Sequence, residues 1–86
     1  MNMESKTDEG KKKTVEVNRL KKVLDQEGLT QVKFASLTVD FAERISSGTI
    51  NKICGHQKAS NRHKHIIVKA LNAYLKKEKY VVSDIF

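Results

Sequence analysis

The polar side chains of residues 46–54, SSGTINKIC, have types and spacing suited to contacts with nucleic acid. If this segment is a helix, Ile50 and Ile53 point into a core and the polar residues around them stay on the outer face. An asparagine on such a face can pair with adenine in the major groove, and a lysine can reach guanine or a phosphate. The first candidate contacts are therefore four side chains of this predicted helix: Ser47, Thr49, Asn51 and Lys52.

The start of the same helix is suited to an anion. Ser46 or Ser47 can cap its N-terminus, which by itself explains both serines. Gly48 leaves no side chain where a duplex would approach, and a helix N-terminus favours a negatively charged phosphate. Asn51 has no such structural explanation, because asparagine inside a helix lowers helix propensity relative to alanine. The chain has no acidic residue from position 45 to position 77, which favours a polyanionic partner.

The charge of the chain is positive and unevenly distributed. The net charge is +7 over 86 residues, yet residues 1–10 carry a net charge of −2. Residues 44–79 hold nine Lys or Arg against the single acid Glu78, a net charge of +8. A basic half on a small domain favours nucleic acid as the partner. The alternative is that these lysines serve solubility alone.

Length and cysteine content narrow the class of protein. A chain this short forms one domain that buries only ~60% of its unfolded surface, so an extended catalytic cleft is not expected. No convergent set of catalytic groups is visible, and we predict neither an enzyme nor a cofactor. Cys54 is the only cysteine. A lone cysteine predicts no intrachain disulfide and fits a reducing compartment, most simply the cytoplasm.

Membrane and metal binding are not expected. No apolar run approaches the ~20 residues that a membrane span needs, and no signal peptide begins the chain. His63 and His65 are two residues apart and His56 is nearby, but residues two apart on a helix do not share a face. Without a cluster of cysteines or carboxylates, these histidines are better explained as exposed groups near phosphate.

The chain divides into a tail and a domain. Residues 1–13 contain no apolar residue except two methionines, which predicts a disordered tail, and residues 14–86 form the folded domain. The tail ends in Lys11, Lys12 and Lys13. These lysines are either solvated or part of an arm that contacts DNA phosphates.

Apolar residues recur at spacings of three and four and proline is absent, which predicts an all-α fold of about five short helices. Asn18 caps the first helix, which Gly28 follows, and Thr30 caps the second. The second helix is longer than usual, with residues 38–40 as a point where it can break. Its apolar stripe consists of Phe34, Leu37, Phe41 and Ile45.

The remaining predicted helices complete the core. The third covers residues 48–54 and Gly55 ends it. The fourth begins near Ser60 or Asn61, and Ser83 caps a last short turn. The expected buried residues are Ile66 or Ile67, Ala70, Leu71 and Tyr74 of the fourth helix, followed by Val81, Ile85 and Phe86.

Several of these segments together resemble a known family. "GLTQ" before the second helix, a Phe–Ala pair inside it, "TINKI" in the third, then "IVKALN" and "VVSDIF" occur in this order. This order is similar to the Cro and phage-repressor type of helix-turn-helix domain, the XRE family, over about residues 17–86. The resemblance implies a lambda-repressor-like fold and a sequence-specific regulator of transcription that binds double-stranded DNA, with the third helix in the major groove.

The resemblance also assigns roles to residues. Gln31 would contact a phosphate or brace a base-reading side chain. The loop after the third helix would hold the sugar-phosphate backbone, and Asn61 or Arg62 would add contacts from the next helix. The full set expected to bind DNA is Gln31, Ser46, Ser47, Gly48, Thr49, Asn51, Lys52, His56, Gln57, Lys58 and Arg62.

One departure from the family pattern concerns the second helix. Seventeen residues separate Gln31 from Thr49, more than the family usually has. We therefore expect a second helix extended by about a turn, with Gln31 farther from the duplex than in relatives.

A domain of this size covers about one half-site, so a homodimer is expected, with Ile85 and Phe86 in its interface. The alternative function is a protein-interaction module, such as the antitoxin partner of a small toxin, whose acidic N-terminal tail folds on its partner.

Overall fold

The computed structural model describes residues 16–86, and in this range the protein is all-α, as the sequence predicts. The predicted tail of residues 1–13 and its three lysines lie outside the described residues. Between residues 16 and 86 no helix is long and apolar enough to cross a membrane. The helices are α2 (Leu20–Gln26), α3 (Gln31–Phe41), α4 (Ser47–Cys54), α5 (Asn61–Leu75) and α6 (Val82–Ile85).

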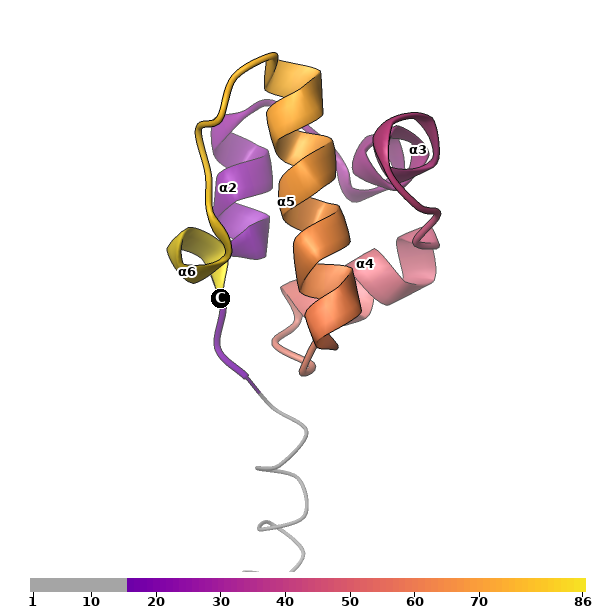
Figure 1. Cartoon of the computed structure of the whole chain (residues 1–86). Helices are drawn as coiled ribbons and strands as arrows, with labels where there is room; N and C mark the ends of the chain where they lie inside the picture. The colour runs from indigo at the N-terminus through magenta and orange to yellow at the C-terminus, as the bar shows by residue number, and fades with distance from the viewer. Residues whose placement is uncertain (1–15) are drawn as a thin grey trace, which may run out of the picture.

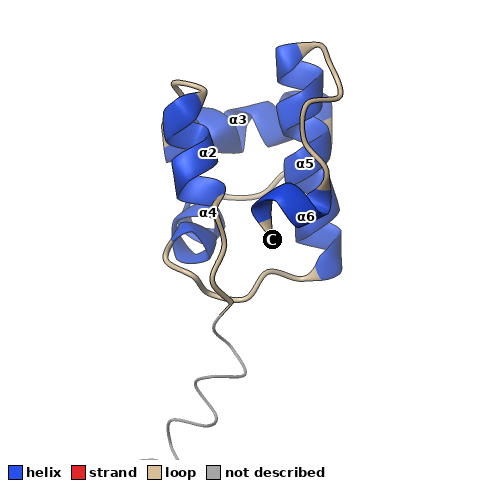
Figure 2. Ribbon diagram, turned by 90° about the vertical axis from the view of Figure 1, so that its left-hand side faces the viewer, coloured by secondary structure: helices blue, strands red, loops and turns tan. Residues whose placement is uncertain are grey.

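The longest helix, α5, runs through the middle of the domain (Figure 1). α3 packs against both α4 and α5, α2 packs against α4, and α6 packs against α5. Figure 2 shows α6 in front, close to the C-terminus. The backbone N–H of Arg19 donates to the carbonyl of Ile85 over 2.8 Å. The C-terminal helix is therefore held beside the start of α2.

Hydroxyl caps set the start of three helices. The side chains of Thr30, Ser46 and Ser60 accept hydrogen bonds from the backbone N–H groups three residues later, over 3.0, 3.2 and 3.1 Å. Each bond satisfies one of the N–H groups that lack a partner in the first turn of a helix. The predicted starts of α3 and α5 are confirmed, and α4 begins one residue earlier than predicted.

The ends of α2 follow the prediction only in part. Gly28 comes after the helix with φ +72°, a left-handed conformation that glycine adopts without steric cost. Asn18 is not the N-cap residue, because α2 begins at Leu20 after Arg19. The side-chain oxygen of Asn18 instead accepts the N–H of Leu20 over 2.9 Å, while its amide group turns toward α4.

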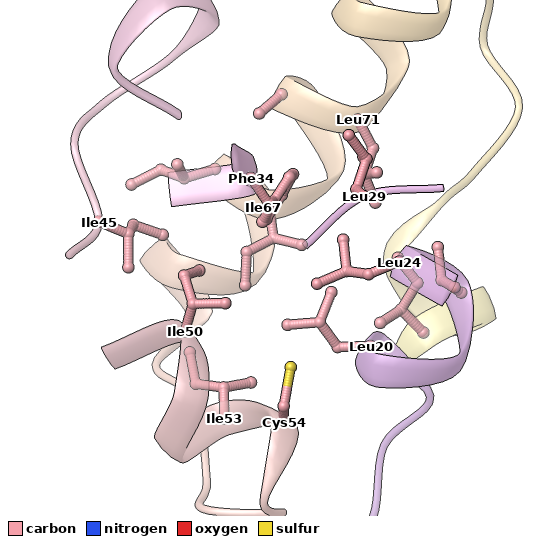
Figure 3. Packing of buried hydrophobic residues seen from close by; sticks show 14 of the residues in the cluster. Leu20, Leu24, Leu29, Phe34, Ile45, Ile50, Ile53, Cys54, Ile67 and Leu71 are labelled. Atoms are coloured by element: carbon pink, nitrogen blue, oxygen red, sulfur yellow. The ribbon is translucent and has the colours of Figure 1, made fainter. Parts of the chain in front are cut away.

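Side chains from all five helices form one hydrophobic core. Figure 3 shows Ile50, Ile53 and Cys54 of α4 directed into the cluster that contains Leu20 and Ile67. Burying one such aliphatic side chain contributes about 1.5–3 kcal/mol. The buried apolar residues are Leu20, Val23, Leu24, Leu29, Phe34, Leu37, Ile45, Ile50, Ile53, Cys54, Ala59, Ile66, Ile67, Ala70, Leu71 and Ile85.

α3 is continuous where the sequence suggested a break. The helix covers 11 residues and runs through positions 38–40 to Phe41, and Ile45 lies beyond its end. The predicted apolar stripe is therefore wrong at Phe41, which is 40% exposed, whereas Ile45 is buried from the turn. Thr38 is fully buried, and two hydrogen bonds satisfy its hydroxyl in the core. It donates to the carbonyl of Ala35 over 2.7 Å and accepts the backbone N–H of Ile45 over 2.9 Å.

Four expectations for the C-terminal part are wrong. Tyr74 is 38% exposed and Val81 is 59% exposed, so neither belongs to the core. The last helix starts after Val81, whose N–H donates to the carboxylate of Asp84 over 2.9 Å, and Ser83 is not its cap. Ile85 does close the core, and because only 2% of it is exposed it is not available to a dimer interface.

A carboxylate links the end of α2 to the segment between α5 and α6. Glu27 Oε2 accepts hydrogen bonds from Lys79 Nζ over 2.7 Å and from the hydroxyl of Tyr80 over 2.6 Å. The bonds from Lys79 and then Tyr80 hold the pKa of Glu27 below its ordinary value of 4.5. Burial, followed by the bond to Glu27, raises the pKa of Tyr80.

Thr38→Val should lower the free energy of unfolding by about 1–3 kcal/mol, because it leaves the buried N–H of Ile45 without an acceptor. Chemical denaturation monitored by circular dichroism measures this loss. Thr38→Ser is the matched control, since it keeps the hydroxyl and should cost less. Equal losses in the two variants would show that the hydroxyl does not stabilise the turn.

Ionised Glu27 should stabilise the fold at neutral pH and lose this effect in acid. Because its pKa is lower in the folded protein, the stabilisation is complete above its ordinary pKa of 4.5 and disappears as the pH falls through the lowered value. The wild type should therefore be more stable than Glu27→Gln at pH 7, and the difference should shrink below about pH 4.5. A difference in unfolding free energy that stays constant down to pH 3 would contradict this assignment.

Candidate nucleic-acid interface

The exposed side of α4 consists of Ser47, Gly48, Asn51 and Lys52, which we call the outer face. Ser47 and Asn51 are four residues apart, as are Gly48 and Lys52, and Gly48 and Asn51 are three apart, so these positions form one stripe along the helix. The opposite side carries Ile50, 0% exposed, and the other residues that α4 buries. The predicted division of this helix into a buried and an exposed side is therefore confirmed, with Thr49 half-buried at the boundary.

Two residues of the outer face are not required by the fold. Gly48 has a negative φ, and a Cβ added to it would meet only Ser46 Oγ, at 3.9 Å. Asn51 is exposed, and its side chain forms no hydrogen bond with any residue of the described range. Both residue types lower helix propensity relative to alanine, by up to about 1 kcal/mol for glycine. Packing and capping therefore leave the presence of both residues unexplained.

Hydroxyl groups at the start of α4 are already engaged within the protein. Ser46 Oγ accepts the backbone N–H of Thr49 and also lies 3.0 Å from Thr49 Oγ1, to which it donates. Ser46 is therefore a structural cap, and Thr49 is the hydroxyl of this pair that keeps its own proton for another acceptor. Ser47 is exposed and has no side-chain hydrogen bond within residues 16–86.

A left-handed residue that is not glycine follows the end of α4. Gly55 ends the helix as predicted, but its φ of −85° is ordinary, and His56 is the left-handed residue with φ +71°. The N–H of Gln57 donates to the carbonyl of Lys52 over 3.0 Å, and the N–H of His56 donates to that of Ile53 over 2.9 Å. This pair of bonds is the Schellman arrangement, which satisfies the last carbonyls of the helix.

The loop after α4 presents polar side chains from a fixed backbone. His56, Gln57 and Lys58 are exposed, whereas Ala59 is only 3% exposed and anchors the loop in the core. Ser60 then caps α5. The side chains of Gln57 and Lys58 form no ion pair or hydrogen bond with other described residues. His56 differs, because its Nδ1 accepts the N–H of Asn18 over 3.3 Å. Of the two ring nitrogens, only Nε2 is left for another partner.

Gln31 and Arg62 lie on helices other than α4. Gln31 begins α3 and is half-buried, so it belongs to a different helix from the outer face. Arg62 is exposed at the start of α5, but Glu43 of the turn before α4 lies 2.8 Å from its Nη2 and accepts from its Nε over 2.9 Å. Exposed ion pairs of this kind contribute little free energy, so a phosphate can replace Glu43.

Two further features of the described residues concern the cysteine and the residue types that can hold a metal ion. Cys54 is buried, and this burial raises the pKa of its thiol, which suits a core residue. Within residues 16–86 no group of three His, Cys, Asp or Glu is arranged to hold a metal ion.

Sequence reasoning missed the two polar residues that fix the ends of α4. Thr38 holds the turn before α4, and Asn18 holds its last turn by donating to the carbonyl of Ile53 over 2.8 Å. Their partners are 7 and 35 residues away in the chain. In the sequence, Thr38 is only a polar residue among apolar ones and Asn18 is only a candidate helix cap, and neither pattern identifies a distant partner.

Comparisons with family models, with curated proteins and with solved structures found no match for this chain.

Proposed function

We propose that this protein is a sequence-specific transcriptional regulator of the Cro and phage-repressor type that binds double-stranded DNA. α4 enters the major groove, where Asn51 and Lys52 contact base edges and Ser47 and Thr49 position the helix on the backbone. The residues concerned are exposed or half-buried, and α4 carries no acidic residue.

The observation that carries this proposal is the composition of the outer face. An eight-residue helix keeps Gly48 and Asn51 at positions where the fold gains nothing from them. A solvated helix face more often carries Glu and Lys, which have high helix propensity. A glycine and an asparagine there are explained by an approaching surface, to which the glycine gives room and the asparagine gives a donor and an acceptor.

Phosphate contacts supply most of the affinity in this proposal. Gln57 and Lys58 lie directly after the last turn of α4, and the N-terminus of α5 follows after two more residues. Lys58 neutralises one phosphate, and Arg62 exchanges Glu43 for another. Gln31 adds a contact from the start of α3. A homodimer on a palindromic site gives two such half-sites, with an interface that excludes the buried Ile85.

Asn51→Ala should weaken binding to the preferred site by about 1–3 kcal/mol and relax the preference at one base pair. Lys58→Ala should instead weaken binding to all duplexes alike and reduce the salt slope of the affinity by about one. Selection of bound duplexes from a random pool gives the site, and fluorescence anisotropy at several salt concentrations gives the affinities. If the two variants behaved alike on specific and random DNA, the groove assignment of α4 would be wrong.

Gly48→Ala separates folding from binding. Alanine should raise the free energy of unfolding by about 0.5–1 kcal/mol, because the site is helical and leaves space for a Cβ. The same methyl group should weaken binding to the preferred duplex if α4 approaches DNA at this point. Thermal unfolding and anisotropy on one protein sample measure both effects. A stabilised protein with unchanged affinity would place the duplex elsewhere.

One observation favours the second candidate, a protein-interaction module such as an antitoxin. Val32 and Val39 of α3 are 68% and 55% exposed, and both line a groove between α3 and the start of α4. Exposed apolar side chains at helical spacing suit a protein partner. Retardation of random duplex at low and moderate salt, compared with co-purification of a partner protein, distinguishes the two functions.

A further inference from the structure

We propose that Asn18 is a positioning residue of the DNA interface, which holds the loop of residues 56–58 in the shape that presents Lys58 to a phosphate. This inference rests on the proposed function, because it concerns how the same interface is built. Asn18 is 9% exposed and is therefore too buried to contact a duplex itself.

Hydrogen bonds from residues 16–18 close over the end of α4, and we call them the clasp. Asn18 Nδ2 donates to the carbonyl of Ile53 over 2.8 Å, and the backbone N–H of Asn18 donates to His56 Nδ1 over 3.3 Å. The backbone N–H of Glu16 donates to the carbonyl of His56 over 2.9 Å. The clasp thus binds the last turn of α4 and both the backbone and the ring of His56.

The loop needs such support because His56 has a left-handed backbone. A residue with a Cβ is disfavoured there relative to glycine, and neighbouring contacts must hold it in place. The Schellman bonds of α4 favour the left-handed turn from one side, and the clasp secures it from the other. Gln57 and Lys58 leave the turn directly after this residue, so the φ of His56 sets their direction.

The clasp is itself fixed to α5. The carboxylate of Glu16 lies 2.9 Å from Lys64 Nζ, and the lysine side chain is only 13% exposed. The Nζ of Lys64 also lies 5.6 Å from the centre of the Phe86 ring. The segment of residues 16–18 is therefore held at α2, α4 and α5, which makes it a rigid support for the loop.

Loss of the clasp should weaken DNA binding through Lys58. A side chain on an unsupported loop must be ordered when the duplex binds, and ordering one long side chain weakens binding by roughly three- to tenfold. Asn18→Ser keeps a short hydroxyl that can still accept the N–H of Leu20, but this hydroxyl cannot reach the carbonyl of Ile53. Its duplex affinity should therefore fall roughly three- to tenfold, with a salt slope shallower by about one.

The test is a double-mutant cycle on one duplex of mixed sequence, because Lys58 acts on every sequence. Anisotropy at several salt concentrations compares the wild type, Asn18→Ser, Lys58→Ala and the double variant. Lys58→Ala should cost much less in the Asn18→Ser background than in the wild type, since the lysine is already displaced there. Asn18→Asp, which keeps the size of the side chain, replaces Asn18→Ser in the cycle if the serine variant does not fold.

Tyr80→Phe is the control for stability alone, because it removes a hydrogen bond at the opposite end of α2. It should lower the unfolding temperature without changing duplex affinity. An equal cost of Lys58→Ala in both backgrounds overturns the role of Asn18 while leaving the proposed function intact. A Lys58→Ala variant with wild-type affinity and slope likewise overturns only the role of Asn18, whereas a wild type that does not retain duplex overturns both.

Discussion

The burial of Ile50 and Ile53 is the constraint on which the candidate interface depends. A helix of eight residues is not stable alone in water, so packing against the rest of the domain decides whether it forms and how it is rotated. Both isoleucines are at most 2% exposed. Because helical positions rotate by a fixed angle, their burial leaves Asn51 and Lys52 on the outside. The chemistry of the outer face thus follows from a hydrophobic contact on the other side of the same helix.

Polar contacts then hold the two ends of α4. Before the helix, the hydroxyl of Thr38 holds the N–H of Ile45, and after it the amide of Asn18 holds the carbonyl of Ile53. Both contacts join groups that would otherwise be buried without partners. Losing either contact therefore costs more free energy of folding than losing an exposed hydrogen bond. A helix fixed at both ends and along one side enters a groove with little loss of freedom. This preorganisation suits recognition of a rigid duplex.

The distribution of ion pairs matches the same surface. Glu16, Glu27 and Glu43 each pair with a cation of a different segment: Lys64, Lys79 and Arg62. None of these carboxylates, and no other in residues 16–86, pairs with a side chain of α4 or with Lys58. The basic groups of the outer face and of the following loop therefore remain unneutralised within the described domain. An unneutralised basic surface attracts a polyanion over distances of about 10 Å at ordinary ionic strength.

The sequence by itself determined the helices, the hydroxyl cap at Thr30, a serine cap before α4, the start of α5 near Ser60 or Asn61 and the outward placement of Asn51, because periodicity and capping act over a few residues. It failed at Tyr74 and Val81, because which apolar residues stay exposed depends on how many neighbours the other helices supply. The partners of Thr38 and Asn18, the left-handed His56 and the pairing of Arg62 with Glu43 were likewise decided only by the tertiary structure. Each depends on contacts between residues that lie 7 to 38 positions apart in the chain. A local sequence pattern does not identify such distant partners.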